Sequence, residues 1–109
     1  MGTLGIASEL TDQAVIAEKM GCHSFWLPES HFGDTRSIPS PLTLLAAVAA
    51  CTSKIKLGST SYLLPIRHPL QAAEEVAVLD RLSGGRVILG VGRGTQQAMF
   101  DAFDVPTKD

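Results

Sequence analysis

The sequence predicts an α/β fold built around a parallel sheet. Short apolar runs alternate with amphipathic helical patterns along all 109 residues, and brief turn signals separate them instead of linkers or repeats. Strands that alternate with helices run parallel and are joined by right-handed crossovers. Short, apolar strands are typical of a sheet that is covered on both faces. The alternation alone is compatible with a doubly wound sheet and with a (β/α)₈ barrel.

The composition favours a globular chain that binds neither nucleic acid nor membrane. It is 45% hydrophobic and 18% charged, with a net charge of −2, so it lacks the basic surface that nucleic acid requires. No apolar run approaches the about 20 residues of a membrane-spanning helix, and the first residues do not resemble a signal peptide. Cys22 and Cys51 form no CxxC pair, so we expect buried thiols in a cytoplasmic protein.

The first part of the chain is expected to contain two strands and a helix. A short strand at residues 3–6 precedes a helix that Thr11 caps and that Gly21 ends in the left-handed conformation. A second strand follows at residues 24–27. Residues 29–39 are rich in glycine, proline and polar side chains, which predicts a loop.

The alternation continues to the end of the chain. The expected elements are a helix over 41–51, a strand within 54–64 that is centred on 55–58, a helix over 69–82, a strand over 86–91 and a helix from Thr95. Ser40 and Pro41 are the N-cap and first residue of one helix, and Pro69 begins the next. The latter helix is expected to bury its apolar side chains, Leu70, Ala73, Val76, Ala77 and Leu82. About four strand–helix units result, about half of a barrel that typically needs about 250 residues.

The loop after the second strand is the first candidate site. In both parallel architectures, function gathers where strands lead into helices. Glu29 and His31 lie there and are suited to acid, base or hydrogen-bond chemistry. The alternative is structural: Glu29 caps a turn and the His31 ring packs on Phe32.

Two further strand ends are candidates for binding a flat, phosphorylated ligand. Small and hydroxyl residues around Thr60 and Ser61 would let such a ligand approach the backbone, unless this is an ordinary strand end. Gly90, Gly92 and Gly94 surround Arg93, and open amides before a helix attract phosphate. The alternative there is a tight turn with a solvated arginine.

Other chemistry receives little support from the sequence. The three histidines lack metal-ligand spacing, so we expect no metal site, and no serine or cysteine lies in a GxSxG motif. Arg67 and His68 precede Pro69, and we interpret this segment as a structural helix start.

Four ordered segments together resemble the luciferase-like flavin-dependent monooxygenases. They are AEKMG with FWLPESHF at residues 17–32, IKLG with LLP and HP at 55–69, EEVAVLDRLSGGR at 74–86, and GVGRG with two phenylalanines at 90–103. The resemblance covers nearly the whole chain. It implies a (β/α)₈ barrel, of which residues 1–109 form the N-terminal part as one partial domain.

The resemblance also implies a cofactor and roles for particular residues. Family members use reduced FMN with oxygen or the deazaflavin F420, and Thr95 with Gln96, where F420 enzymes often carry an acidic residue, favours FMN. The implied catalytic residue is His31, and Thr60, Ser61 and Arg93 are implied to bind the flavin. The family also often has a non-proline cis peptide at the bond that corresponds to Thr60–Ser61.

Two features set this chain apart. Many of the monooxygenases have two adjacent histidines after the glutamate, whereas this chain has Ser30 and His31, and a serine is a poor general base near neutral pH. Half a barrel would also expose two sheet edges, so we expect either a fragment of a longer protein or a homodimer. Three functions stay open: an FMN monooxygenase acting on a small molecule, an F420 oxidoreductase, and a non-catalytic flavin-binding chain.

Overall fold

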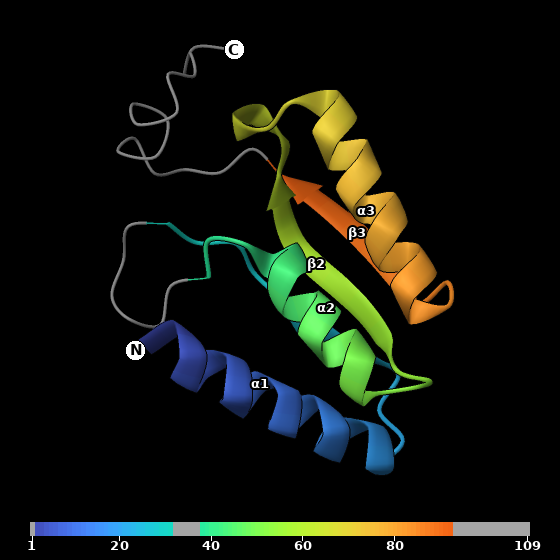
Figure 1. The fold of residues 1–109 in the computed structure, drawn as a ribbon. Helices are drawn as coiled ribbons and strands as arrows, with labels where there is room; N and C mark the ends of the chain where they lie inside the picture. Colours follow the sequence, from blue (N-terminus) through green and yellow to red (C-terminus); the bar gives the residue numbers. More distant parts are fainter. Residues whose placement is uncertain (1, 32–37, 93–109) are drawn as a thin grey trace.

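The structure is a computed structural model that describes residues 2–31 and 38–92. Within these residues the elements follow one another along the chain as drawn in Figure 1: α1 (Gly2–Lys19), β1 (Ser24–Leu27), α2 (Pro41–Cys51), β2 (Lys56–Leu63), the 3₁₀ helix η1 (Leu64–Ile66), α3 (Pro69–Ser83) and β3 (Val87–Gly92). No helix in this part of the chain is both long and apolar enough to cross a membrane.

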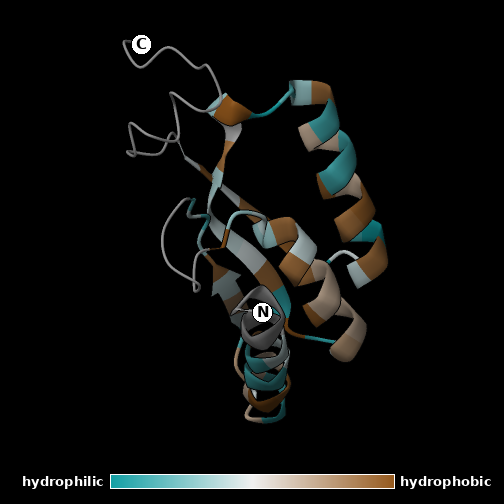
Figure 2. Cartoon of the chain, turned by 60° about the vertical axis from the view of Figure 1, so that its left-hand side comes forward, coloured by the Kyte–Doolittle hydropathy of each residue, from teal (hydrophilic) through white to brown (hydrophobic). Residues whose placement is uncertain are grey.

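The three described strands form a parallel sheet in the order β1-β2-β3. Figures 1 and 2 show α2 and α3 on the same side of this sheet, with α1 beside α2. The strand order therefore follows the chain order, and the described helices cover one face only. A doubly wound sheet differs because its helices lie on both faces. A layer of the observed kind is the arrangement from which a (β/α)₈ barrel is built.

The predicted strand at residues 3–6 is wrong, because these residues belong to α1. The helical pattern extends back to Gly2 without a proline to interrupt it. Thr11 consequently lies inside the helix, and its hydroxyl donates to the Ser8 carbonyl at 2.9 Å instead of capping the helix. The described residues thus hold three strands instead of the expected four, and the predicted helix from Thr95 lies outside them.

The other predicted helix boundaries agree with the structure. Gly21 follows α1 with a φ of +83°, as expected for a residue that ends a helix in the left-handed region. Ser40 and Pro41 begin α2, and His68 and Pro69 begin α3. The His68 ring accepts the Leu70 amide through Nδ1 at 3.2 Å, which confirms that this histidine has a structural role.

The core lies between the helices and the sheet. Its fully buried side chains include Leu45, Val48, Ile55, Leu57 and Tyr62. Brown, hydrophobic segments along α2 and α3 in Figure 2 mark the elements that supply much of this layer.

The face that α3 buries differs in part from the predicted one, although Val76 packs against the core as expected. Its buried residues are Ala72, Leu79 and Ser83, whereas Leu70 and Leu82 are 69% and 64% exposed. Positions 72, 76, 79 and 83 form one stripe at helical spacing, and that stripe faces the sheet. Val78 and Leu82 line a hollow on one side of this stripe, and Ala73 and Ala77 line a hollow on the other side. Periodicity detected an apolar helix without identifying which of its stripes meets the sheet.

The expectation of buried thiols is also wrong, because both Cys22 and Cys51 are exposed. Cys22 follows the turn at Gly21, and Cys51 is the last residue of α2, which ends at the surface.

Arg86 anchors the amino end of the sheet. The residue is 7% exposed, and all five of its N–H donors bind neutral oxygens. Its Nε donates to the Ser83 carbonyl at 2.5 Å, and Nη1 donates to Thr52 Oγ1 and the Ile55 carbonyl at 2.8 and 3.1 Å. Its Nη2 donates to the carbonyls of Ala49 and Thr52 at 3.1 and 3.2 Å.

Glu18 binds the amides of the same turn whose carbonyls bind Arg86. One oxygen, Oε2, accepts the amides of Ser53, Lys54 and Ile55 at 2.8, 2.6 and 3.0 Å. These bonds, led by the one from Lys54, lower the pKa of Glu18 because they stabilise its charged form. The turn that enters β2 thus presents its amides to Glu18 and its carbonyls to Arg86.

We expect Arg86→Met to lower the free energy of unfolding by about 3 kcal/mol, because buried carbonyls would lose their donors. Urea unfolding of the protein that contains this chain measures the loss. Arg81→Met, at an exposed position near the end of α3, is the matched control and should cost little. Equal losses for the two variants would contradict the anchoring role.

Candidate functional site

A buried carboxylate joins the carboxyl ends of β1 and β2. Glu29 lies two residues after β1, and its side chain is 0% exposed. Its Oε1 accepts the Leu63 amide at 2.9 Å, while Oε2 accepts Arg67 Nη1 at 2.9 Å and meets His31 Nε2 at 2.5 Å. Burial of a charge is unfavourable without such partners. We call Glu29, His31 and Arg67 the carboxylate cluster.

Arg67 is held on two further sides. Its Nη1 also donates to the Leu63 carbonyl at 2.7 Å, and its guanidinium lies 4.0 Å from the centroid of the Tyr62 ring. The Tyr62 hydroxyl donates to Glu75 on α3 at 3.2 Å. Burial raises the pKa of the Tyr62 phenol, with Arg67 opposing the shift, so the phenol stays neutral and serves as a hydrogen-bond donor.

His31 lies at the strand end where the sequence placed it, with its side chain 7% exposed. Glu29 does not cap a local turn, as the structural alternative proposed, because it crosses to the backbone of β2. Phe32, the other half of that alternative, lies outside the described residues. Sequence reasoning missed Arg67, which it took for part of a helix start. A usable signal was that Arg67 follows the strand beside Glu29, and parallel strands share one carboxyl edge.

Ser30 closes the loop that follows β1. Its amide donates to the Ile38 carbonyl at 2.8 Å, and its hydroxyl accepts the Ile38 amide at 2.9 Å. The serine that stands in place of a family histidine therefore has a structural task here, because it pairs the two sides of the loop.

The strand β2 contains a bulge at the residues predicted to meet a flavin. The Thr60–Ser61 peptide bond is cis, as the family resemblance implied, and the register with β3 shifts between Ser59 and Tyr62. Thr60 is exposed and Ser61 is half-buried. Their binding of a cofactor stays a prediction.

Glycines in β3 make room for this bulge. A Cβ atom on Gly90 would lie 2.4 Å from the Ser59 carbonyl oxygen, and one on Gly92 would lie 2.6 Å from Ser61 Cβ. In β2, a Cβ on Gly58 would meet the Trp26 ring at 2.4 Å. Any side chain at these positions would force the neighbouring atoms to move.

These glycines lie on the sheet face that no described helix covers, which we call the bare face. The Trp26 ring packs over Gly58 on this face, and the Ser61 side chain lies against Gly92. Trp26, Gly58 and Ile88 share one row of the sheet register, and Phe25, Leu57 and Val87 share the next row. The second row packs against the core, so the first row points to the opposite face. With Gly90 and Gly92 two and four residues beyond Ile88, this bare face runs to the carboxyl edge that carries the carboxylate cluster.

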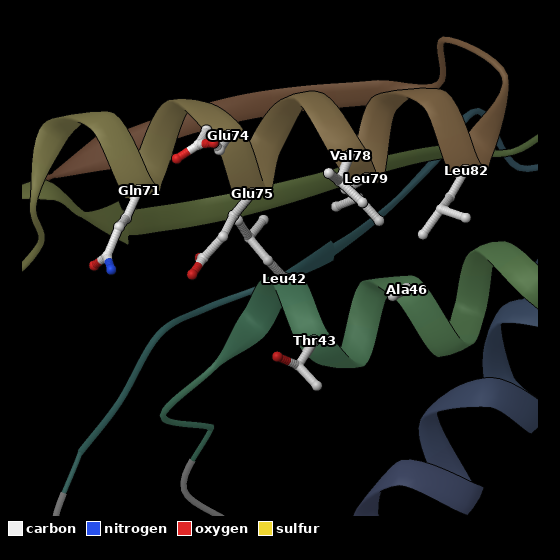
Figure 3. A pocket seen from close by; sticks show the side chains of 9 residues that line it. All are labelled: Leu42, Thr43, Ala46, Gln71, Glu74, Glu75, Val78, Leu79 and Leu82. Atoms are coloured by element: carbon white, nitrogen blue, oxygen red, sulfur yellow. The ribbon is translucent and has the colours of Figure 1, made fainter.

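The groove between α2 and α3 is a separate feature. It has a volume of about 520 Å³ and is lined by side chains of these two helices alone, as Figure 3 shows. It lies in the helical layer and contains no member of the carboxylate cluster. We therefore place the candidate site at the strand ends.

Arg93, the predicted phosphate ligand, lies outside the described residues. Among the described residues, no group of three or more His, Cys, Asp and Glu side chains is placed so that it could hold a metal ion.

Comparison with known proteins relates this chain to a family. The sequence profile of the luciferase-like monooxygenases matches residues 2–109. Limonene 1,2-monooxygenase from Rhodococcus erythropolis is 42% identical over 103 residues, which cover 81% of this chain and 27% of the relative. The chain therefore spans well under two thirds of this curated relative.

Solved structures agree with this sequence match. The oxygenating constituent of 3,6-diketocamphane monooxygenase from Pseudomonas putida, in complex with FMN, superposes with a TM-score of 0.87 at 29% identity, over 93% of this chain and 28% of that one. The coenzyme F420-dependent tetrahydromethanopterin reductase from Methanopyrus kandleri superposes with a TM-score of 0.76 at 34% identity, over 93% and 27%.

We expect Gly90→Ala to lower the free energy of unfolding by about 2 kcal/mol, because the new methyl group overlaps the Ser59 carbonyl. Gly21→Ala is the matched comparison. Its Cβ meets nothing within 4 Å, so only the positive φ is penalised, by about 1 kcal/mol. Chemical denaturation measures the free energy of unfolding of both variants. A smaller decrease for Gly90→Ala than for Gly21→Ala would show that the bulge moves to accommodate the added methyl group.

Proposed function

Because the chain belongs to the luciferase-like monooxygenase family, we propose that the protein carrying it is an FMN-dependent monooxygenase. The enzyme uses reduced FMN and oxygen to oxidise a small organic substrate. Its complete fold is a (β/α)₈ barrel, and the present residues supply part of the wall. We keep the cytoplasm as its proposed location.

The observation that carries this proposal is the bare sheet face beside a buried acid–base pair. Gly90 and Gly92 carry no side chains that would hold a flat ring system away from the backbone. Glu29 and His31 lie at the carboxyl edge of the same sheet. Catalytic groups of barrel enzymes gather at this edge. The absence of side chains at Gly90 and Gly92 and the polar groups at the strand ends support the proposal that a flavin binds here.

Each predicted residue has a role in this proposal. Thr60 and Ser61 contact the flavin through their backbone and hydroxyl groups, and Arg93 holds its phosphate. Bound reduced FMN supplies the electrons that oxygen activation consumes. His31 donates a hydrogen bond or moves a proton beside the reacting atoms. Ser30 is not assigned a proton-transfer role, because its hydroxyl closes the loop.

An F420-dependent oxidoreductase is the second candidate, supported by the similarity to the Methanopyrus reductase. We favour FMN for two reasons. The similar camphane-oxidising enzyme was solved with FMN, and Thr95 and Gln96 occupy positions where F420 enzymes often have an acidic residue.

We expect the protein to bind FMN, and Arg93→Ala to weaken that binding by about 1.5–3 kcal/mol, the size of a charge-assisted hydrogen bond. Fluorescence titrations with oxidised FMN, reduced FMN and F420 measure the dissociation constants. Arg81→Ala is the control for loss of a positive charge. Binding of F420 in preference to FMN would support the second candidate, and an unchanged constant for Arg93→Ala would remove its proposed role.

We expect His31→Gln to reduce turnover about 10²- to 10⁴-fold, the range of a positioned acid or base, with a smaller effect on stability. Oxygen consumption with reduced FMN and thermal unfolding are measured on the same preparation. A variant that unfolds while its remaining folded fraction keeps full activity would identify His31 as a packing residue.

A further inference from the structure

We propose that Glu29 is a positioning residue that fixes His31 as the tautomer protonated on Nε2, and that Arg67 and the Leu63 backbone hold Glu29 in place for this task. The kinetic part of this inference rests on the proposed function. The tautomer itself does not, because it follows from the geometry of the carboxylate cluster.

The tautomer follows from the chemistry of the contact. A carboxylate oxygen offers only lone pairs, so a partner at hydrogen-bond distance must supply the hydrogen. His31 Nε2 lies 2.5 Å from Glu29 Oε2, which also accepts from Arg67. An unprotonated Nε2 would bring two lone pairs together where the Glu29 side chain is fully buried and water cannot intervene. The proton therefore resides on Nε2 of His31.

The orientation of Glu29 is determined by one residue of β2. The Leu63 amide donates to Glu29 Oε1, and the Leu63 carbonyl accepts from Arg67, whose same nitrogen donates to Glu29 Oε2. Glu29, Leu63 and Arg67 thus form a closed ring of hydrogen bonds. Because two of its contacts are to backbone, a rotation of the Glu29 side chain would break several bonds at once.

Arg67 and Tyr62 determine the described charge environment of Glu29. Arg67 balances Glu29, so the pair is neutral before His31 is considered. Tyr62 faces Arg67 as a neutral phenol, and Glu75 lies beyond it at the Tyr62 hydroxyl.

The tautomer determines which ring nitrogen of His31 exchanges a proton. With Nε2 committed to Glu29, the nitrogen of His31 that gains or loses a proton during turnover is Nδ1. A neutral ring accepts the proton on Nδ1, becomes an imidazolium, and returns the same proton from the same atom. Glu29 does not take up a proton in this cycle; it orients the ring, as a buried carboxylate does for catalytic histidines generally.

The first test reads the tautomer directly. Nitrogen NMR of histidine-labelled protein distinguishes the two neutral forms, and we expect His31 to show the form protonated on Nε2. In Glu29→Gln the amide can donate to the ring, so we expect that form to lose its dominance. His68→Ala, which removes a helix cap in the same segment as Arg67, should leave the His31 signals unchanged. A wild-type His31 protonated on Nδ1 would overturn the inference without any variant.

The second test asks whether the orientation matters for turnover. We expect Glu29→Gln to lower kcat about 10²- to 10⁴-fold, with KM and the FMN dissociation constant changed less than threefold, because the substitution misorients a ring without removing it. An unchanged kcat in a folded variant with an altered tautomer would overturn the positioning role. A wild-type protein that binds no flavin would instead contradict the proposed function, and the NMR result alone would then decide the inference.

Discussion

Every N–H of the Arg86 guanidinium binds an oxygen at the amino end of the sheet, and the placement of β2 depends on this constraint. The Arg86 carbonyl accepts the Leu57 amide at 2.8 Å, so the same residue that holds the turn also starts the β2–β3 ladder. That ladder sets Ser59 beside β3 such that its carbonyl comes against Gly90. Because side chains alternate between the faces, a slip of one residue would exchange the bare face for the packed one.

Each end of the sheet holds one buried charged side chain that needs hydrogen-bond partners, and the two charges have opposite signs. At the amino end a buried cation is satisfied by backbone carbonyls, whereas at the carboxyl end the buried anion Glu29 takes a backbone amide and two side-chain donors. At the amino end, the Arg86 guanidinium stays charged at every accessible pH. The carboxyl end includes His31, the residue proposed to move a proton. The stabilising contacts of Arg86 and the proposed chemistry thus lie at opposite ends of the sheet, as is usual for strands of barrel enzymes.

Local signals predicted much of this fold. The helix starts at Ser40–Pro41 and at Pro69 were predicted correctly, because they depend on local backbone chemistry. The left-handed glycine after α1 was predicted correctly for the same reason. The strand at residues 3–6 failed because a short apolar run fits either state when no breaker separates it from a helix. The buried face of α3 was missed because the neighbours that select one stripe are distant in sequence.

The site was predictable to a similar degree. His31 and Glu29 were found because they follow a strand, and the cis bond at Thr60–Ser61 came from the family resemblance. Arg67 was missed because its partner, Glu29, lies 38 residues away in sequence, and only the folded sheet brings the two together. The role of Ser30 depended in the same way on Ile38 across the loop.

The packing of Trp26 on Gly58 gives the protein a built-in optical reporter. Trp26 is the one tryptophan in these 109 residues, and it lies on the bare sheet face with 39% of its surface exposed. Its indole nitrogen donates to Ser24 Oγ at 2.7 Å, so the ring is held at both its edge and its face. Flavins absorb in the range where tryptophan emits. Binding of a flavin on this face would therefore quench the fluorescence of Trp26 by energy transfer, so binding could be followed without an added label.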